Sequence, residues 1–205
     1  MKIRNYLVMS MCLIGLSACA SKESPSSIPY DAPDGTVVNT FVLPPIPDED
    51  EVDATLLGVD VNDNGIRDEI ERKIIIDLAD DKNAHALTAV TLQDAKSFQS
   101  VMIDSGRNFE PLQSVECKYY WIEQRQNMTK DIMTAYHEYK SVDNLQLKDL
   151  SLNTQERMRK WFEWWKNMDG TQNSSSDDPI SPDVCTYDVK SFIEKDYNKQ
   201  KTVNN

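Results

Sequence analysis

The sequence predicts an all-α fold, a small irregular helical bundle that follows a flexible tether and a polar loop. Apolar residues recur three and four positions apart over long stretches, which is the spacing of one face of an α-helix. No stretch keeps the two-residue alternation of a half-buried strand, and no internal repeat is visible. We expect helices over residues 68–78, 83–104, 112–140 and 154–168, and a short last helix over 184–197.

The chain begins with the pattern of a secretory leader. Lys2 and Arg4 form a basic end, and the apolar stretch over residues 6–16 has the length of a signal-peptide core but is too short to span a bilayer as a mature helix. The letters LSAC at residues 16–19 resemble the lipobox of bacterial lipoproteins. The resemblance implies that residues 1–18 are a lipoprotein signal peptide that is removed.

The same resemblance gives Cys19 a role. In that family the cysteine is lipidated on its sulfur, and its new amino terminus is acylated with a fatty acid such as palmitate. The implied location is a bacterial cell envelope, with the membrane as partner through the lipid anchor. Ala20 follows where an aspartate favours retention at the inner membrane, so the outer membrane is expected. The alternative is an ordinary secretory signal with a chance cysteine.

Residues 19–53 are expected to form a proline-rich tether between the lipid and the domain, which is expected over residues 54–197 and is followed by a disordered tail over 198–205. A polar segment rich in proline is mostly extended and cannot bury a core. The apolar run over residues 37–43 is an exception, which either forms one short strand or packs onto the domain. Six of the nine prolines lie in the tether: Pro25, Pro29, Pro33, Pro44, Pro45 and Pro47.

Residues 60–71 fit every fixed position of the calcium-loop pattern D-x-[DN]-x-[DN]-G-x₅-E. Calcium is a hard cation that takes six to eight oxygens, and Gly65 allows the sharp turn that folds the chain around the ion. The alternative is a polar turn that precedes a helix. The expected Ca²⁺ ligands are the side chains of Asp60, Asn62, Asn64, Asp68 (directly or through water) and Glu71, and the backbone carbonyl of Ile66.

This loop resembles an EF-hand in its ligands but not in its surroundings. The entering segment, residues 52–57, is too short and too acidic for a convincing helix, the loop is single, and Arg67 stands where an aliphatic residue normally pairs with a second loop. The loop therefore resembles those of dockerin and thrombospondin type 3 modules. Residues 58–69 also resemble a segment of uncharacterised bacterial lipoproteins, G-[VI]-D-x-[ND]-x-[ND]-G-[IV]-R-D-[DE], for which no activity is known.

The helices after the loop are predicted from spacing and end signals. Acidic residues in the first turn from Asp68 suit the helix dipole, and Gly106 and Gly170 end the second and fourth helices. Asn153 and Glu156 open the fourth helix at capping-box spacing. The expected buried stripes are Ile70, Ile74 and Leu78; Leu87, Thr91, Ala95, Phe98 and Met102; and Val115, Tyr119, Ile122, Thr129, Ile132, Tyr136 and Tyr139.

Aromatic residues crowd the fourth helix. Phe162 and Trp164 point away from its expected core face, so part of the cluster is available to a protein partner or a sugar. The expected core face, at helical spacing, is Met158, Trp161, Trp165 and Met168.

The cysteines indicate one disulfide. Cys12 leaves with the leader and Cys19 is used for the lipid, so Cys117 and Cys185 remain as a pair in an exported, oxidising environment. The disulfide would join a middle helix to the C-terminal part of the chain. The alternative, a metal-binding or catalytic thiol, has little support because the chain has two histidines and no CxxC motif.

The net charge excludes one class of partner. The formal charge is −12, and it becomes −14 when Lys2 and Arg4 leave with the leader. A chain this acidic is a poor nucleic-acid binder, because phosphate contacts need a basic surface. An acidic field does concentrate calcium, although a solvated acidic surface alone explains the charge.

No catalytic motif is present, and the sequence therefore predicts no enzyme. His85 and His137 stand alone and are expected to be surface or satisfied helix residues. The predicted function is a membrane-anchored, calcium-binding, non-catalytic envelope lipoprotein in which calcium is structural. The alternative is a protein-interaction module with a protein partner, such as an envelope assembly factor or an immunity protein that neutralises a toxin.

Overall fold

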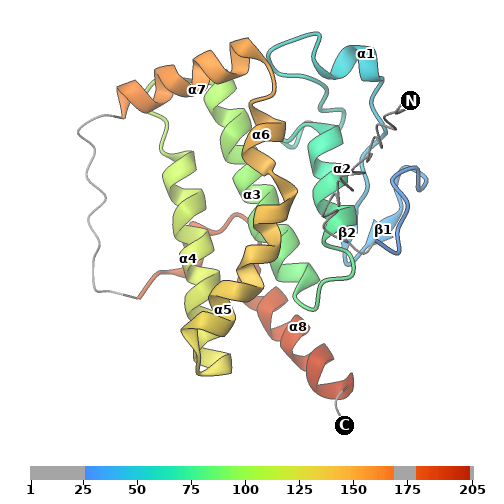
Figure 1. The fold of residues 1–205 in the computed structure, drawn as a ribbon, viewed down its shortest axis with the longest axis vertical. Helices are drawn as coiled ribbons and strands as arrows, with labels where there is room; N and C mark the ends of the chain where they lie inside the picture. Colours follow the sequence, from blue (N-terminus) through green and yellow to red (C-terminus); the bar gives the residue numbers. More distant parts are fainter. Residues whose placement is uncertain (1–25, 169–178, 204–205) are drawn as a thin grey trace, which may run out of the picture.

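A computed structural model describes residues 26–168 and 179–203, apart from the side chains at 141, 143 and 144. This part of the chain is mostly helical, with eight α-helices and one small β-hairpin, so the all-α prediction is confirmed (Figure 1). The helices surround α3, which lies at the centre of the molecule and packs against α2, α4, α6, α7 and α8. The core residues of α3 include Leu87, Val90 and Val101, all fully buried.

The elements follow one another in a simple order. The two strands pair antiparallel, with Val37 opposite Val42 and Val38 opposite Phe41. The bounds are β1 Val37–Val38, β2 Phe41–Val42, α1 Glu49–Val52, α2 Asp68–Asp77, α3 Ala84–Ile103, α4 Glu110–Thr129, α5 Ile132–Tyr139, the 3₁₀ helix η1 Lys140–Leu145, α6 Leu147–Ser151, α7 Gln155–Asn167, the 3₁₀ helix η2 Pro182–Val184, and α8 Val189–Val203.

The single helix predicted over residues 112–140 is wrong, because the chain forms two helices there. Lys130 takes a left-handed conformation with φ 60° and ψ 20°, which ends α4. Asp131 then caps α5 by accepting hydrogen bonds from the backbone N–H groups of Met133 and Thr134. The predicted buried stripe is wrong as well. Four of its members, Val115, Tyr119, Ile132 and Tyr136, are exposed, and α4 buries Ser114, Cys117, Tyr120, Trp121 and Arg125 instead.

The core face of α7 also differs from the prediction. Trp164 is buried and donates its indole N–H to the carbonyl of Asn108 at 2.7 Å, whereas Trp165 is 66% exposed. The buried face also includes Arg157, and a prediction from the spacing of apolar residues misses a buried charged side chain. Thr154, one residue later than predicted, caps the helix by accepting from the backbone N–H of Arg157.

The C-terminal part of the chain begins its helix later and ends it later than predicted. The helix α8 starts at Val189 and continues through Val203, so most of the predicted tail over residues 198–205 is helical. A disulfide joins Cys117 of α4 to Cys185, which precedes α8, as the sequence predicts.

The described part of the expected tether, residues 26–53, lies against the domain. Leu43 and Val38 are buried with Ile75 and Ile76 of α2. The fully buried guanidinium of Arg72 donates to the carbonyls of Tyr30, Ala32 and Pro44. These backbone contacts hold an otherwise extended, proline-rich segment in place, and they explain why composition alone did not reveal it.

Candidate functional site

The candidate metal centre is the loop over residues 60–71, which lies after the short helix α1 and includes the start of α2. The helix begins at Asp68, so the last part of the loop is the first turn of α2. The positive end of the helix dipole favours carboxylates there. Gly65 has φ 83°, a left-handed conformation that suits glycine, and it makes the turn that the sequence predicts.

Asp60 organises the first half of the loop. Its Oδ2 accepts a hydrogen bond from the backbone N–H of Gly65 at 2.8 Å, and its Oδ1 accepts from that of Asn64 at 3.2 Å. Asn64 Oδ1 accepts in turn from the backbone N–H of Ile66 at 2.8 Å. The loop is therefore wound around its own side chains, with Asp60 facing the turn at Gly65.

Glu71 closes the loop from α2. Its carboxylate is 6% exposed, and Oε2 accepts hydrogen bonds from the amide Nδ2 of Asn62 at 3.1 Å and of Asn64 at 2.9 Å. Burial raises the pKa of Glu71, the two amide donors oppose that shift, and the charges of Asp68 and Asp60 add to it. Three predicted ligands from loop positions 3, 5 and 12 thus meet at one oxygen atom.

Asp68 is the least solvated of the predicted ligands. It is 0% exposed, its Oδ2 accepts from the backbone N–H of Val61 at 3.1 Å, and its Oδ1 has no hydrogen-bond partner among the described residues. Burial raises its pKa, and Asp60 raises it further. A buried carboxylate oxygen without a partner is costly, so this position favours a cation.

The remaining predicted ligand, Ile66, packs its side chain into the core and anchors the loop. Within the described ranges, no three His, Cys, Asp or Glu side chains stand close enough together to hold a metal ion. The carboxylates of the loop instead hydrogen-bond to amide groups. Cys19 and the leader lie outside the described residues.

Two buried arginines hold the loop against the rest of the domain. Arg67 donates to the carbonyl of Leu150 in α6 at 2.7 Å and lies 3.3 Å from the carboxylate of Glu69. Arg157 of α7 donates to the carbonyls of Val52, Thr55 and Leu56, each at 3.0 Å, in the segment that enters the loop.

Gly58 makes room for these arginines. It has φ +68°, and a β-carbon at this position would lie 2.5 Å from Cδ of Arg67. The glycine and the arginine that the sequence pattern contains are therefore in contact. Arg67 connects the single loop to α6, which gives a structural role to a residue that departs from the EF-hand pattern.

Two further neighbours of the loop come from distant parts of the chain. Lys96 of α3 lies across Gly65, and the negative charge of Glu71 contributes to the raised pKa of Tyr187, which burial brings to about 12. Neither residue belongs to the motif. The spacing of residues within the loop carries no signal for them, because only the packing of α2 against the rest of the domain brings them close.

The two histidines lie in different environments. His85 is buried, and its Nδ1 lies 2.6 Å from Oδ1 of Asp196 in α8. Asp196 also accepts from the backbone N–H groups of His85 and Ala86, so it satisfies the first turn of α3. His137 is exposed on α5. This arrangement is that of a satisfied buried histidine and a surface histidine.

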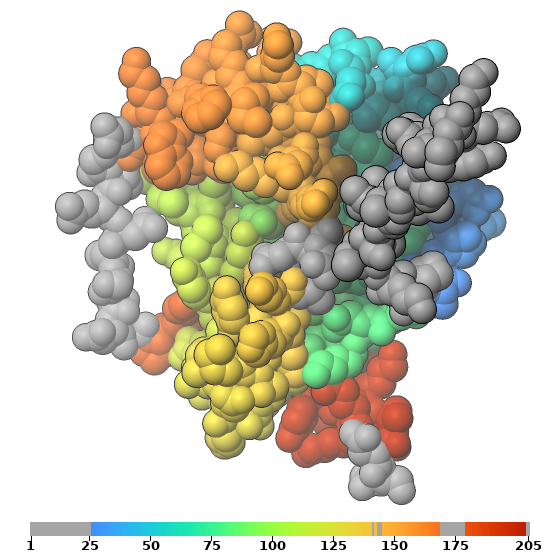
Figure 2. All heavy atoms as spheres, viewed as in Figure 1, coloured from blue at the N-terminus to red at the C-terminus, as the bar shows by residue number. Residues whose placement is uncertain are grey.

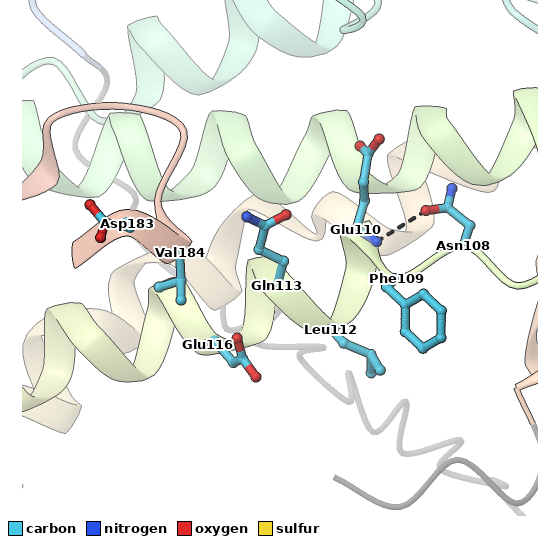
Figure 3. Close-up of a pocket in the computed structure, with 8 residues that line it drawn as sticks. All are labelled: Asn108, Phe109, Glu110, Leu112, Gln113, Glu116, Asp183 and Val184. Atoms are coloured by element: carbon cyan, nitrogen blue, oxygen red, sulfur yellow. Dashed lines mark hydrogen bonds between the residues drawn. The ribbon is translucent and has the colours of Figure 1, made fainter. Parts of the chain in front are cut away.

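Two surface cavities are also free of histidine. One of about 540 Å³ lies between α4 and η2, with Phe109 at one end of its lining and Asp183 at the other (Figure 3). Another of about 350 Å³ contains the Lys118–Asp94 ion pair, whose atoms are 2.6 Å apart. Neither cavity brings together the side chains of a recognisable catalytic group.

No described helix combines the length and the apolar character needed to cross a bilayer. Comparison of the chain with protein-family models, curated proteins and solved structures finds no significant match.

Proposed function

We propose that this chain is a calcium-binding lipoprotein of the bacterial cell envelope, in which calcium is structural and no reaction is catalysed. The observation that carries the proposal is the meeting of Asn62, Asn64 and Glu71 beside the turn at Gly65. Residues of this type at this spacing supply the oxygens that a hard cation needs.

The loop needs only local changes to accept the ion. A half-turn of each asparagine amide about its Cβ–Cγ bond exchanges nitrogen and oxygen, and it would then present oxygens beside Glu71. The change costs the backbone hydrogen bonds that Asn62 and Asn64 now accept. The free Oδ1 of Asp68 and the charge of three nearby carboxylates favour it.

Calcium would act as a cross-link between the loop and α2. Asp60, Asn62 and Asn64 would bind from the loop, the carbonyl of Ile66 from the turn, and Asp68 and Glu71 from the helix. Because the unfolded chain lacks such a site, binding would add to folding stability in proportion to the logarithm of calcium concentration over Kd.

Thermal unfolding of a soluble form that starts at Ser21, with calcium titrated against magnesium, tests this proposal. Calcium is expected to raise the Tm, and Asp60→Ala and Glu71→Gln are each expected to abolish the rise. Asp63→Asn is the matched control, because it removes a charge from the same loop at a position that supplies no ligand and already has φ 53°. No shift at millimolar calcium would leave the loop as a polar turn.

The proposed lipid anchor has its own test. The leader, the motif at residues 16–19 and the paired state of the other two cysteines of the mature chain support Cys19 as the lipidated residue. Radiolabelled palmitate is expected to enter the full chain and to co-fractionate with outer membranes. Cys19→Ser is expected to lose both properties, and retention of the label would contradict the assignment.

A second candidate is a protein-interaction module, which the exposed face of α7 favours. Met158, Phe162 and Trp165 lie at positions i, i+4 and i+7 on a helix that covers one end of the molecule (Figure 2). Their side chains are 36%, 63% and 66% exposed. An exposed apolar stripe of this kind, rich in aromatic side chains, is typical of a binding surface.

This second function is tested by a paired substitution on α7. Phe162→Ser with Trp165→Ser is expected to leave the Tm of the isolated protein unchanged and to abolish a cross-linked complex in intact envelopes. Tyr119→Ser, at an exposed aromatic residue of α4, is the control. Loss of the calcium response in the first experiment would make this candidate the leading one.

A further inference from the structure

Lys96 of α3 places a positive charge beside the turn of the calcium loop at Gly65. Its Cε lies 3.3 Å, and its Nζ 3.7 Å, from the point that a β-carbon on Gly65 would occupy. Gly65 stands between Asn64 and Ile66, which are both proposed ligands. The ammonium group of α3 therefore lies against the turn between these two residues.

Among the described residues, the charge of Lys96 has no ion-pair partner. No carboxylate oxygen of the described chain lies within 4.0 Å of its Nζ, whereas Lys118, which also approaches α3, pairs with Asp94 at 2.6 Å. Lys96 is only half-buried, so its ammonium keeps part of its hydration. The loop thus faces a full positive charge across a glycine that has no side chain to separate them.

We infer that the charge of Lys96 lowers the calcium affinity of the loop, so that the site fills only at high calcium concentration. This inference rests on the proposed calcium site. An ammonium near a dication raises the free energy of the bound state by Coulomb repulsion. The Debye length is roughly 10 Å at 0.1 M salt, so dissolved ions screen a repulsion across the turn only partly.

The stem of Lys96 also packs on Gly65, and the experiment must separate packing from charge. Lys96→Met keeps an unbranched apolar side chain and removes the charge. Lys96→Arg keeps the charge. Lys166→Met removes a charge of the same sign from α7 and serves as the control for net charge.

Calorimetric titration of the soluble form from Ser21 with calcium chloride provides the measurement. At about 20 mM salt, Lys96→Met is expected to bind calcium on the order of three- to tenfold more tightly than the wild type. Lys96→Arg and Lys166→Met are expected to stay within about twofold of it. The gain is expected to shrink at about 0.5 M salt, where screening is strong.

A trivalent probe supplies a second signature. Coulomb repulsion scales with ion charge, so the logarithm of the gain for terbium(III) is expected to be about 1.5 times that for calcium. A packing effect predicts no such scaling and no salt dependence. Equal calcium affinities of wild type and Lys96→Met, or a gain that salt does not change, would overturn the inference alone. Absence of calcium binding in every protein would overturn it together with the proposed site.

Discussion

Glu71 shows how one carboxylate can be costly without calcium and useful with it. Burial raises its pKa above the ordinary value of 4.5, so the folded chain holds the neutral form more strongly than the unfolded chain does. The stability that this group contributes is fully present below the unfolded pKa, and it is lost as pH rises through the folded pKa. At neutral pH the calcium-free loop therefore carries an unfavourable buried charge.

Glu71→Gln is accordingly expected to stabilise the calcium-free protein at pH 7, because glutamine resembles the neutral acid. The advantage over the wild type is expected to disappear as pH falls below about 4.5, where both side chains are uncharged. Urea unfolding in the presence of a chelator, at a series of pH values, measures this difference. If Glu71→Gln is less stable than the wild type by the same amount at pH 7 and at pH 4, the lost hydrogen bonds outweigh the removed charge.

Arg157 provides a second prediction at the level of single residues. Its guanidinium donates to three carbonyls and to the side chains of Asp53 and Asn153. Arg157→Met leaves those buried carbonyls without donors and is expected to cost about 3–5 kcal/mol of unfolding free energy. Arg159→Met, on the exposed face of the same helix, is expected to change it by less than about 0.5 kcal/mol. Similar losses in the two variants, measured by urea unfolding, would contradict the role of Arg157.

At the level of elements, the junction between α4 and α5 is the least expected feature. Lys130 occupies the left-handed region without being glycine. An L-residue loses roughly 1–2 kcal/mol there, and glycine loses about 0.5–1 kcal/mol of extra chain entropy, so Lys130→Gly is expected to stabilise the protein by about 0.5–1 kcal/mol. Asp131→Ala is expected to destabilise it by about 1 kcal/mol through loss of the cap. Chemical unfolding measures both, and destabilisation by Lys130→Gly would show that its side chain contributes more than its backbone conformation costs.

The sequence predicted both ends of α2 and of α3 to within about one residue. Their apolar spacing is regular, and acidic residues or a nearby glycine mark their ends. It did not predict the break at Lys130, since neither glycine nor proline marks it. It placed the core faces of α4 and α7 incorrectly because Arg125 and Arg157 are buried there. Hydrogen bonds to carbonyls and carboxylates make such arginines core residues, and apolar spacing cannot reveal those partners.

The candidate site was more predictable than the helix faces. The proposed ligands lie within twelve residues, and a glycine turn brings most of them together without help from the rest of the fold. The surroundings of the loop were not predictable. Lys96, Arg157 and Leu150 approach it from other helices, and their positions follow from packing around α3 rather than from local spacing.

At the level of the whole molecule, the N-terminal segment belongs to the domain from Ser26 onward. Ser27 donates from its backbone N–H and its hydroxyl to Asp80, and Asn39 donates to the carbonyl of Ala79. If Cys19 carries the lipid, only seven residue steps separate it from Ser26. A fully extended chain of that length reaches about 25 Å, so the domain would stay close to the membrane surface.

Arg72 is the residue on which this compact arrangement depends most, because it donates hydrogen bonds to three backbone carbonyls of the segment. Arg72→Met is expected to release residues 30–44 locally, since its partner Asp34 is exposed and no buried charge is left unpaired. Chymotrypsin would then cut after Phe41 at least about tenfold faster than in the wild type, as expected when local opening becomes easier by roughly 1.4 kcal/mol. Lys73→Met, at the neighbouring and more exposed position of α2, is expected to keep the wild-type rate. Equal cutting rates in wild type and Arg72→Met would mean that the other contacts are enough to hold the segment: the burial of Leu43 and Val38 against α2, and the hydrogen bond from Asn39 to the carbonyl of Ala79.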